Sequence, residues 1–580
     1  MSYEQNEDSV AISASLVDAC QKAAEQGIAK AQVILGWCYQ NGEGGVAVDL
    51  PLAFSWFLKG AEQGLAEAQF IVGWSYQNGE GIEPDPGEAV HWYHRAAEQG
   101  HASGQCQLGV CYMNGEGVAK DPAQAFGWFL KAAEQGDVEG QYHLGWCYNK
   151  GVGVERNPAQ AALWIRQAAE QGHAGGQYHL GMCYAEGIGL EQNATQAVYW
   201  FRLAVEQENA QAQYSLGWCY GNGIGLEQDF AQSVIWYYKA AEQGLAEAQD
   251  GLGVYYMSGL GLVENPAQAA HWLLKAAQQG HAGGQYHLGL CYANGIGMAV
   301  APDLAAHWYR LAAEQNHAMA QNSLGDCYRN GAGVAQDHTQ AARWYRQAAE
   351  QGLAKGQYHL GLCYTSGLGV EKDPTQAVHW YREAAKQGEA KAQNHLGECY
   401  RAGIGIAKNP EQAARWYREA AEQGDASGQC NLGMCYGHGA GVELNHSIAI
   451  HWFRTAADQG HAKGQYNLGW SYENGAGVQE DPQQAAHWYR LAAEQGDASA
   501  QCNLGVCYRF GKGVEEDPAQ AVHWYRKAAE QGDADAQFNI GWCYENGEGV
   551  TRNQEQAKIW YRKAAKQGHA EASMKTRSLK

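Results

Sequence analysis

The pattern of apolar and polar positions predicts a short amphipathic helix in residues 101–114. Small or apolar residues stand at Gly104, Leu108, Cys111 and Tyr112. Residues that are four, seven and eight positions apart share one face of an α-helix. We therefore predict that this face is buried against neighbouring elements.

A second amphipathic helix is predicted after a short loop. Asp121 and Pro122 are typical of a helix start, because an Asp side chain accepts hydrogen bonds from free N–H groups and proline lacks one. Gln124 makes this start similar to a capping box. The buried face of the helix is predicted to hold Ala125, Trp128, Phe129, Ala132 and Ala133.

Three glycines have predicted roles in this helix–turn–helix. Gly109 lies in mid-helix, where glycine costs about 1 kcal/mol relative to alanine, so we expect a close approach by a neighbouring element. Gly115 follows the first helix and Gly136 follows the second. Glycine best tolerates the left-handed conformation that ends a helix.

The segment 101–136 is one unit of a tandem repeat. Glu-Gln-Gly ends at Gly64 and again at Gly100, and the 36-residue period then runs without insertion or deletion to Gly568. One further unit precedes Gly64 and is longer by one residue near Gly45. Fifteen units of fixed length are typical of a solenoid, in which each unit buries its apolar face against its neighbours.

The repeated residues resemble a known family. Leu-Gly-x-Cys-Tyr-x-x-Gly-x-Gly-Val, then Asp-Pro-x-x-Ala, then Trp-Tyr-x-x-Ala-Ala is similar to the Sel1-like repeat, a relative of the tetratricopeptide repeat, over residues 28–568. The resemblance implies an all-α fold, an α/α superhelical solenoid. It also implies a scaffold or adaptor for protein–protein interaction, without naming a partner.

The ends of the chain differ from the repeats. Residues 1–27 are predicted to be a tail and a capping helix, because residues 9–26 resemble a lone second helix. Residues 569–580 are predicted to be a truncated first helix, Glu571 to Met574, followed by a basic tail.

Composition narrows the function classes. The net charge of −22 argues against nucleic acid, whose phosphates need a basic surface. No run of about 20 apolar residues predicts a membrane span, and residues 1–10 lack the features of a secretory signal. We therefore expect a cytoplasmic monomer, although export by a signal-independent route stays open.

Cysteine is abundant but repeats with the units. Twelve of the 16 cysteines occupy the place of Cys111. Equivalent places on packed helices lie roughly 8–10 Å apart, beyond the ~7 Å Cα separation that a disulfide spans. We predict buried thiols in a reducing compartment.

The variable positions of the first helix indicate where a partner binds. We count places from the glycine that ends the preceding unit, so that residue 101 is place 1. Places 4, 5, 8, 9, 11 and 12 are nearly constant, as stacking requires, whereas places 3, 6, 7, 10, 13 and 14 vary. In folds of the resembled type the first helices line the concave side, so the variable places would face the groove.

Aromatic residues gather on the variable places. Fifteen of the 21 tryptophans occupy place 28 of the second helix, and the other six occupy place 10. Exposed Trp and Tyr are frequent interface anchors; the alternative is that they pack against the next unit. The candidates at place 10 are Trp37, Trp74, Trp146, Trp218, Trp470 and Trp542, and those at place 6 are Phe70, Tyr142, Tyr214, Tyr466 and Phe538.

The middle of the chain is polar at the same places. An Asn, an acidic residue and an Arg recur there, and they would bind a peptide backbone or a basic side chain. The alternative is an ordinary surface ion pair at i, i+3 spacing. The two sets are Asn322, Asp326 and Arg329, and Asn394, Glu398 and Arg401.

Catalytic and metal motifs are not recognisable. The 22 histidines fall into repeated series without His-x-x-x-His or Cys-x-x-Cys pairs, so neither a metal site nor a cofactor is expected. The Gly-x-Gly loops lack a preceding strand, and no nucleophile motif occurs. We expect a non-enzymatic scaffold that binds a protein or peptide. The alternatives are an exported factor that engages host proteins, a protein that binds cell-wall ligands or acts as an enzyme, and a mechanical spacer.

Overall fold

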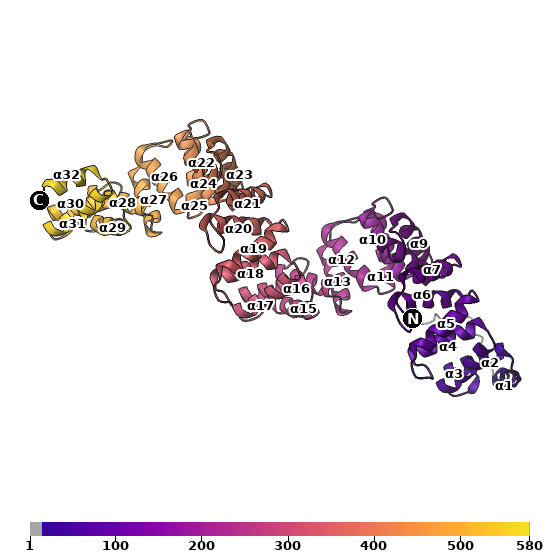
Figure 1. Ribbon diagram of the computed structural model, residues 1–580. Helices are drawn as coiled ribbons and strands as arrows, with labels where there is room; N and C mark the ends of the chain where they lie inside the picture. Colours follow the sequence, from indigo (N-terminus) through magenta and orange to yellow (C-terminus); the bar gives the residue numbers. More distant parts are fainter. Residues whose placement is uncertain (1–13, 579–580) are drawn as a thin grey trace. The chain divides into compact units, whose positions relative to one another are not determined.

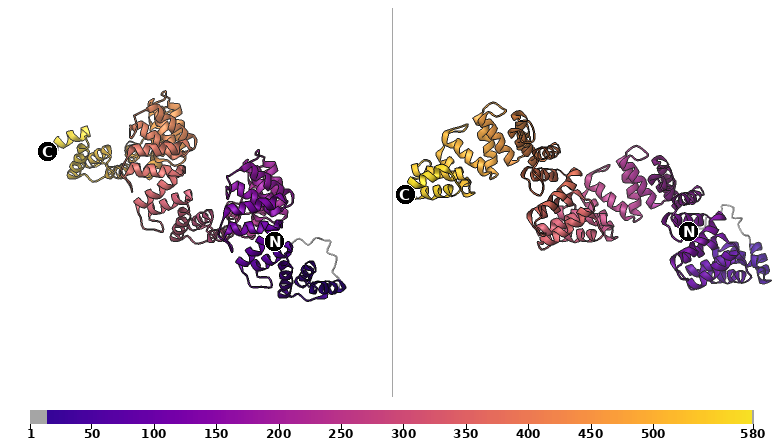
Figure 2. Two further views of the ribbon diagram at one scale, coloured as in Figure 1. Left: turned by 45° about the vertical axis from the view of Figure 1, so that its right-hand side comes forward. Right: turned by 45° about the horizontal axis from the view of Figure 1, so that its top comes forward.

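The computed structural model describes residues 14–578, and all their regular structure is helical. Helices of 13 residues alternate with short loops, and the two helices of each unit pack side by side (Figure 1). Figure 2 shows from two other directions that successive helices lie side by side within residues 14–278 and again within residues 302–578. The prediction of an all-α solenoid of 36-residue helix pairs is confirmed.

The first helices of the fifteen units carry even numbers. They are α2 (Ala29–Asn41), α4 (Ala66–Asn78), α6 (Ala102–Asn114), α8 (Val138–Lys150), α10 (Ala174–Glu186), α12 (Ala210–Asn222), α14 (Ala246–Ser258), α16 (Ala282–Asn294), α18 (Ala318–Asn330), α20 (Ala354–Ser366), α22 (Ala390–Ala402), α24 (Ala426–His438), α26 (Ala462–Asn474), α28 (Ala498–Phe510) and α30 (Ala534–Asn546).

The second helices carry odd numbers. They are α3 (Leu50–Glu62), α5 (Pro86–Glu98), α7 (Pro122–Glu134), α9 (Pro158–Glu170), α11 (Ala194–Glu206), α13 (Phe230–Glu242), α15 (Pro266–Gln278), α17 (Pro302–Glu314), α19 (His338–Glu350), α21 (Pro374–Lys386), α23 (Pro410–Glu422), α25 (His446–Asp458), α27 (Pro482–Glu494), α29 (Pro518–Glu530) and α31 (Gln554–Lys566).

The elements outside these pairs lie at the ends and in the longer unit. Helix α1 (Ala14–Glu25) precedes the first pair, and the short 3₁₀ turn η1 (Glu43–Gly45) accommodates the extra residue near Gly45. The last helix, α32 (Ala570–Ser578), is longer than the predicted segment Glu571 to Met574 and includes much of the basic tail. The expected tail before residue 14 and the last two residues lie outside the described part.

The chain divides into two compact units. One contains the described residues up to His287 together with 296–298, and the other contains 288–295 and the residues from Ala299 onward. The sequence contains no signal for this division, since the repeat continues across it. No helix within residues 14–578 is long and apolar enough to cross a bilayer.

Side-chain caps fix where the second helices begin. Oδ1 of Asp121 accepts hydrogen bonds from the backbone N–H groups of Ala123 and Gln124 at 3.0 and 3.1 Å. Asp or Asn stands at this place in every second helix except α17, where Ala301 provides no side-chain cap. The predicted caps are thus confirmed.

Two glycines of the unit are required by close packing. A Cβ atom on Gly109 would lie 2.6 Å from the ring of Phe129, so the aromatic ring of the second helix occupies the space of the missing side chain. Gly117 has a φ of +69°, and a Cβ there would overlap the carbonyl of Pro86 in the preceding unit. The first contact closes a unit and the second joins it to the one before.

A buried glutamine at place 5 also joins successive units. Nε2 of Gln105 donates to the carbonyl of Ala97 in the preceding second helix at 3.1 Å. Its Oε1 accepts from Nε2 of Gln135, at the end of its own second helix, at 2.7 Å. The same two contacts recur around Gln69 and Gln321, for example, so one side chain connects three helices.

The second-helix face is buried as predicted except at tryptophan. Ala125, Phe129, Ala132 and Ala133 are buried, but Trp128 is only half-buried. Nζ of Lys131 lies 3.9 Å from its ring centre, so this indole forms part of the surface and takes a cation–π contact. The core of this unit therefore depends on the residue at place 29, Phe129, whereas the equivalent Trp92 and Trp272 are buried.

We expect opposite effects from two Gly→Ala substitutions in this unit. Gly109→Ala pushes against Phe129 and should destabilise the protein by about 1–3 kcal/mol, because packed interiors tolerate added atoms poorly. Gly127→Ala is the control, since it lies within α7 with nothing near its Cβ position, and it should stabilise by about 0.5–1 kcal/mol through helix propensity. Urea denaturation midpoints measure both, and equal effects of the two variants would contradict the packing role of Gly109.

Candidate functional site

The aromatic residues at place 6 pack inside the repeat stack. Phe70 stacks on His101 of the next unit with ring centroids 5.0 Å apart, and Phe538 stacks on His569 at 4.6 Å. Tyr214 stacks on Tyr237 of its own second helix at 5.3 Å. Two further members behave alike: Tyr142 contacts His173 at 4.5 Å, and Tyr466 contacts Tyr489 at 5.9 Å. This supports the alternative that place 6 serves stacking.

The tryptophans at place 10 separate into two groups. Trp218 and Trp470 each expose 45% of their surface. The other four are partly buried against core clusters: Trp37, Trp74, Trp146 and Trp542. The guanidinium of Arg509 also lies 3.6 Å from the ring centre of Trp542. Two of the six candidates are therefore well exposed.

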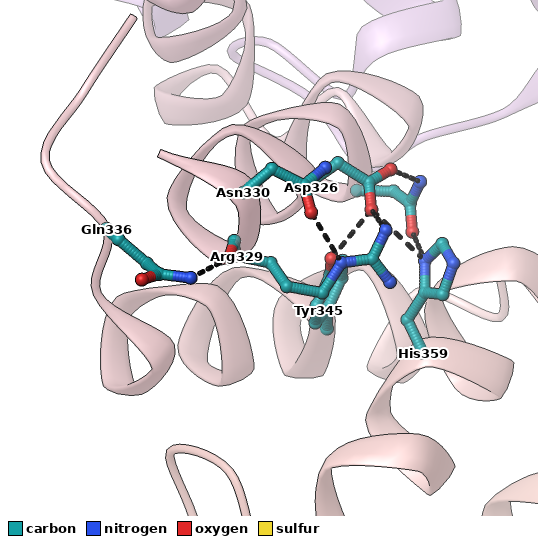
Figure 3. A network of polar contacts seen from close by, with 7 residues as sticks. Asp326, Arg329, Asn330, Gln336, Tyr345 and His359 are labelled. Atoms are coloured by element: carbon teal, nitrogen blue, oxygen red, sulfur yellow. Dashed lines mark hydrogen bonds and ion pairs between the residues drawn. The ribbon is translucent and has the colours of Figure 1, made fainter. Parts of the chain in front are cut away.

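The first polar set forms a closed network (Figure 3). Oδ1 of Asp326 accepts a hydrogen bond from the Tyr345 hydroxyl at 2.7 Å and pairs with the Arg329 guanidinium at 2.9 Å. Nδ1 of His359 lies 2.8 Å from Oδ1 of Asn322, whose amide donates to Asp326 at 3.4 Å. The groups of this set are thus engaged with one another, and the ion pair has the i, i+3 spacing of the alternative.

The second polar set is arranged differently. Oδ1 of Asn394 accepts a hydrogen bond from Nδ2 of Asn431 at 2.8 Å. Glu398 and Arg401 line a pocket of about 310 Å³ between α20 and α22. The difference follows from the next unit, where Asn431 replaces the histidine found at His359.

Three candidates are corrected by their burial. Phe70 and Asn322 expose 7% of their surface and Asn394 exposes 4%. They lie at place 6, one of the variable places that the sequence analysis expected to face the groove. The structure covers this place because a first helix contacts both the aromatic ring of its own second helix and the next unit. The expectation that these three side chains face an open groove is therefore wrong.

Burial also controls the ionisation of His359. Loss of hydration lowers the pKa of His359 to about 4, against the opposing effect of Asp326. Burial lowers the pKa of four other histidines as well: His101, His143, His179 and His461. His359 is therefore neutral near pH 7.

Two pockets open beside the exposed tryptophans. The first has a volume of about 390 Å³ and is lined by Met182, Phe201, Tyr214 and Trp218 among others. The second has a volume of about 290 Å³ and includes Trp470. Each lies between two successive first helices, α10 and α12 or α24 and α26, and reaches down to the second helix between them.

A larger and more polar pocket adjoins the first of these. Its volume is about 550 Å³, and it lies between α8 and α10. Lys150, Arg156 and His179 line it, and it shares Met182 and Glu186 with the pocket beside Trp218. The variable places of the first helices thus form a surface with pockets between particular pairs of successive first helices.

The sequence analysis missed the residues on the floors of the two pockets beside Trp218 and Trp470. Phe201 and Phe453 occupy place 29, which looked like a uniform core place, and Ala185 and Gly437 occupy place 13. A comparison of these two places across the units would have singled out these two pairs, because only there does Phe at place 29 meet Ala or Gly at place 13.

Fourteen of the 16 cysteines are buried, and Cys20 and Cys399 are partly buried. All 16 are free, and burial raises the pKa of Cys111 to about 11 and that of Cys147 to about 12. Such thiols are protonated near pH 7 and are poor nucleophiles. Within residues 14–578 no three His, Cys, Asp or Glu side chains gather as around a metal ion.

Comparison with protein-family models identifies the repeat. The model described as the Sel1 repeat matches fifteen consecutive segments, from 29–65 to 534–569. These segments agree with the predicted units to within a residue or two. The comparison with curated protein sequences gave no match.

Solved structures of the same kind are similar in sequence. A protective antigen of uropathogenic Escherichia coli with an SLR fold is 37% identical, with 85% of this chain and 97% of that chain covered and a TM-score of 0.49. A Sel1 repeat protein from Oxalobacter formigenes is 34% identical, with 54% of this chain and 91% of that chain covered and a TM-score of 0.42.

We expect His359 to titrate near pH 4 rather than near the ordinary 6.5. Because its pKa is lower in the folded than in the unfolded protein, the stability that it contributes is lost as the pH falls from about 6.5 to about 4. The measurement is an NMR titration of the imidazole signals. The control is His359→Asn, which copies Asn431 and should remove one signal and reduce the loss of stability. A midpoint at pH 6 or above would contradict the burial.

Proposed function

Because this chain belongs to the Sel1 repeat family, whose members generally act in protein–protein interaction, we propose that it is a non-enzymatic scaffold. In this proposal a protein or peptide partner binds the first-helix face, which we define as the surface formed by the variable places of the even-numbered helices. Repetition extends this face through successive units, so a partner can contact several of them.

The exposure of Trp218 and Trp470 carries the proposal. Each large indole leaves 45% of its surface uncovered and borders a pocket, whereas the equivalent Trp146 and Trp542 are partly buried. Half-exposed Trp next to a hollow is the arrangement that interface hot spots favour, because an apolar group of a partner then covers the ring.

Charge and thiol chemistry support a protein partner inside the cell. The net charge of −22 disfavours nucleic acid, and 16 free thiols support a reducing compartment such as the cytoplasm. The alternative of an exported factor has the same first-helix face and would differ only in where its partner is found.

The test compares two pairs of exposed aromatic residues. Trp218→Ala with Trp470→Ala removes the rings from the first-helix face. Tyr199→Ala with Tyr238→Ala is the matched control, since these tyrosines lie on second helices and expose 52% and 45% of their surface. In quantitative pull-downs we expect the affinity of the tryptophan variant for its partner to fall by about tenfold or more. Truncation of a hot-spot residue costs at least about 1.4 kcal/mol, which corresponds to a factor of ten in affinity.

Circular dichroism establishes that both variants keep their helices. If the tyrosine variant loses the partner and the tryptophan variant keeps it, the binding surface lies on the second helices instead. A partner kept by both would contradict the proposed use of the first-helix face.

A further inference from the structure

The pockets beside Trp218 and Trp470 are copies of one another. All eleven lining residues of the second pocket lie 252 residues, or seven repeat periods, after a lining residue of the first, which has Gln192 in addition. One copy lies in each compact unit. The corresponding pairs include Met182 and Met434, Ala185 and Gly437, Ala197 and Ala449, Phe201 and Phe453, Tyr214 and Tyr466, and Trp218 and Trp470.

Places 13 and 29 set how apolar the floor of such a pocket is. Pockets at the equivalent position also open between α8 and α10, over Ile165 and Asn149, and between α20 and α22, over Tyr381 and Thr365, and their floors carry a polar group.

In most units place 29 is Tyr, and its hydroxyl is often bonded to the side chain at place 13 above it. The Tyr93 hydroxyl donates to Gln77 at 2.6 Å, and that of Tyr489 donates to Glu473 at 2.6 Å. The two side chains together place polar atoms in the space between successive first helices.

The two pockets lack both of these groups. Phe201 and Phe453 have no hydroxyl, and Ala185 and Gly437 have almost no side chain. Two other units show how the space is filled when one group is absent. Met113 packs into the core cluster of Phe129, and the Tyr255 ring lies 5.5 Å from Tyr237, with its hydroxyl against Gly221.

The walls of the two pockets favour a bulky apolar side chain. Met, Phe, Tyr and Trp line both of them, and their volumes of about 390 and 290 Å³ exceed that of a single side chain such as Leu. An aromatic or aliphatic group placed there would cover the exposed face of Trp218 or Trp470.

Cationic side chains lie in the repeat unit that precedes each pocket. Lys150 and Arg156 line the polar pocket that adjoins the first copy. Both are exposed, and neither forms an ion pair with a carboxylate in the described part of the chain. The repeat unit before the second copy likewise has two exposed cations, Arg401 and Lys408.

These cations stand out in a protein with a net charge of −22. Glu186 lies between the two pockets of the first copy and offsets one of the two positive charges there. Its place in the second copy is taken by His438. Glu398 lines a pocket together with Arg401 and offsets one of the two positive charges near the second copy. A negative charge on the ligand complements the remaining positive charge at each site.

We propose that the two pockets are two copies of one peptide-binding site, each of which takes a bulky apolar side chain with an acidic residue next to it. The site rests on the proposed scaffold function and specifies its ligand. A partner that carries this short motif twice gains affinity from both copies if its linker spans them.

The probes are blocked, fluorescein-labelled peptides that contain Glu-Glu-Leu or Leu-Glu-Glu between glycines. We expect saturable binding to two sites per chain in fluorescence anisotropy. Exchange of Glu for Lys, or of Leu for Gly, should weaken binding by about tenfold or more, since one buried apolar group or one charge pair contributes that much.

Pocket-filling variants test the location. Ala185→Met with Gly437→Met places at both sites the residue that fills the equivalent space at Met113, so the fold should persist and binding should fall by about tenfold or more. Met113→Ala is the reverse change, which should open a third pocket over Phe129 and raise the number of Leu-dependent sites to three. Lys150→Ala with Arg156→Ala should abolish the preference for Glu at the first copy alone.

The proposal is overturned if neither peptide binds saturably up to about 1 mM. It is also overturned if the affinity is unchanged when Leu in the peptide is replaced by Gly, or when Ala185 and Gly437 are replaced by Met. Failure of the scaffold function is a separate result. A partner that depends on Trp218 and Trp470 in pull-downs but not on the Met substitutions would keep the first-helix face and reject the ligand chemistry.

Discussion

The stack of repeats depends on the buried amide of Gln at place 5. In α6 its side chain donates to the end of one second helix and accepts from the end of the next, with both atoms out of water. A buried amide must have its partners, since an unsatisfied one costs about 1–3 kcal/mol. The contact therefore fixes how one unit follows another, and the glycines at Gly109 and Gly117 allow the approach that it requires.

This strict frame restricts variation to a few places, and those places interact. Place 13 and place 29 meet between successive first helices, as the Tyr561 hydroxyl on Glu545 shows at 2.7 Å. A change at one place thus alters what the side chain at the other place contacts, and with it the polarity of the space between the helices. Repetition keeps the scaffold uniform, and departures from the pair provide local sites without disturbing the stack.

Much of the fold was predictable because its determinants are local. The apolar spacing of 101–114, the cap at Asp121 and the glycine at Gly115 each specify an element within a few residues, and the structure confirms them. The site was predicted less well. Place 6 varies between units, so Phe70 and Asn394 were expected on an open face. Variability carries no information about neighbouring elements, and these side chains are covered by the second helix and the next unit.

The sequence by itself determined the helix pairs, their period and the family, since a repeated pattern averages out the ambiguity of any single unit. Only the tertiary structure decided which aromatic residues are exposed. Trp146 and Trp218 occupy the same place in two units, yet one is partly buried and the other borders a pocket. Exposure depends on the residues that surround a ring, and these come from three successive helices whose packing no single helix specifies.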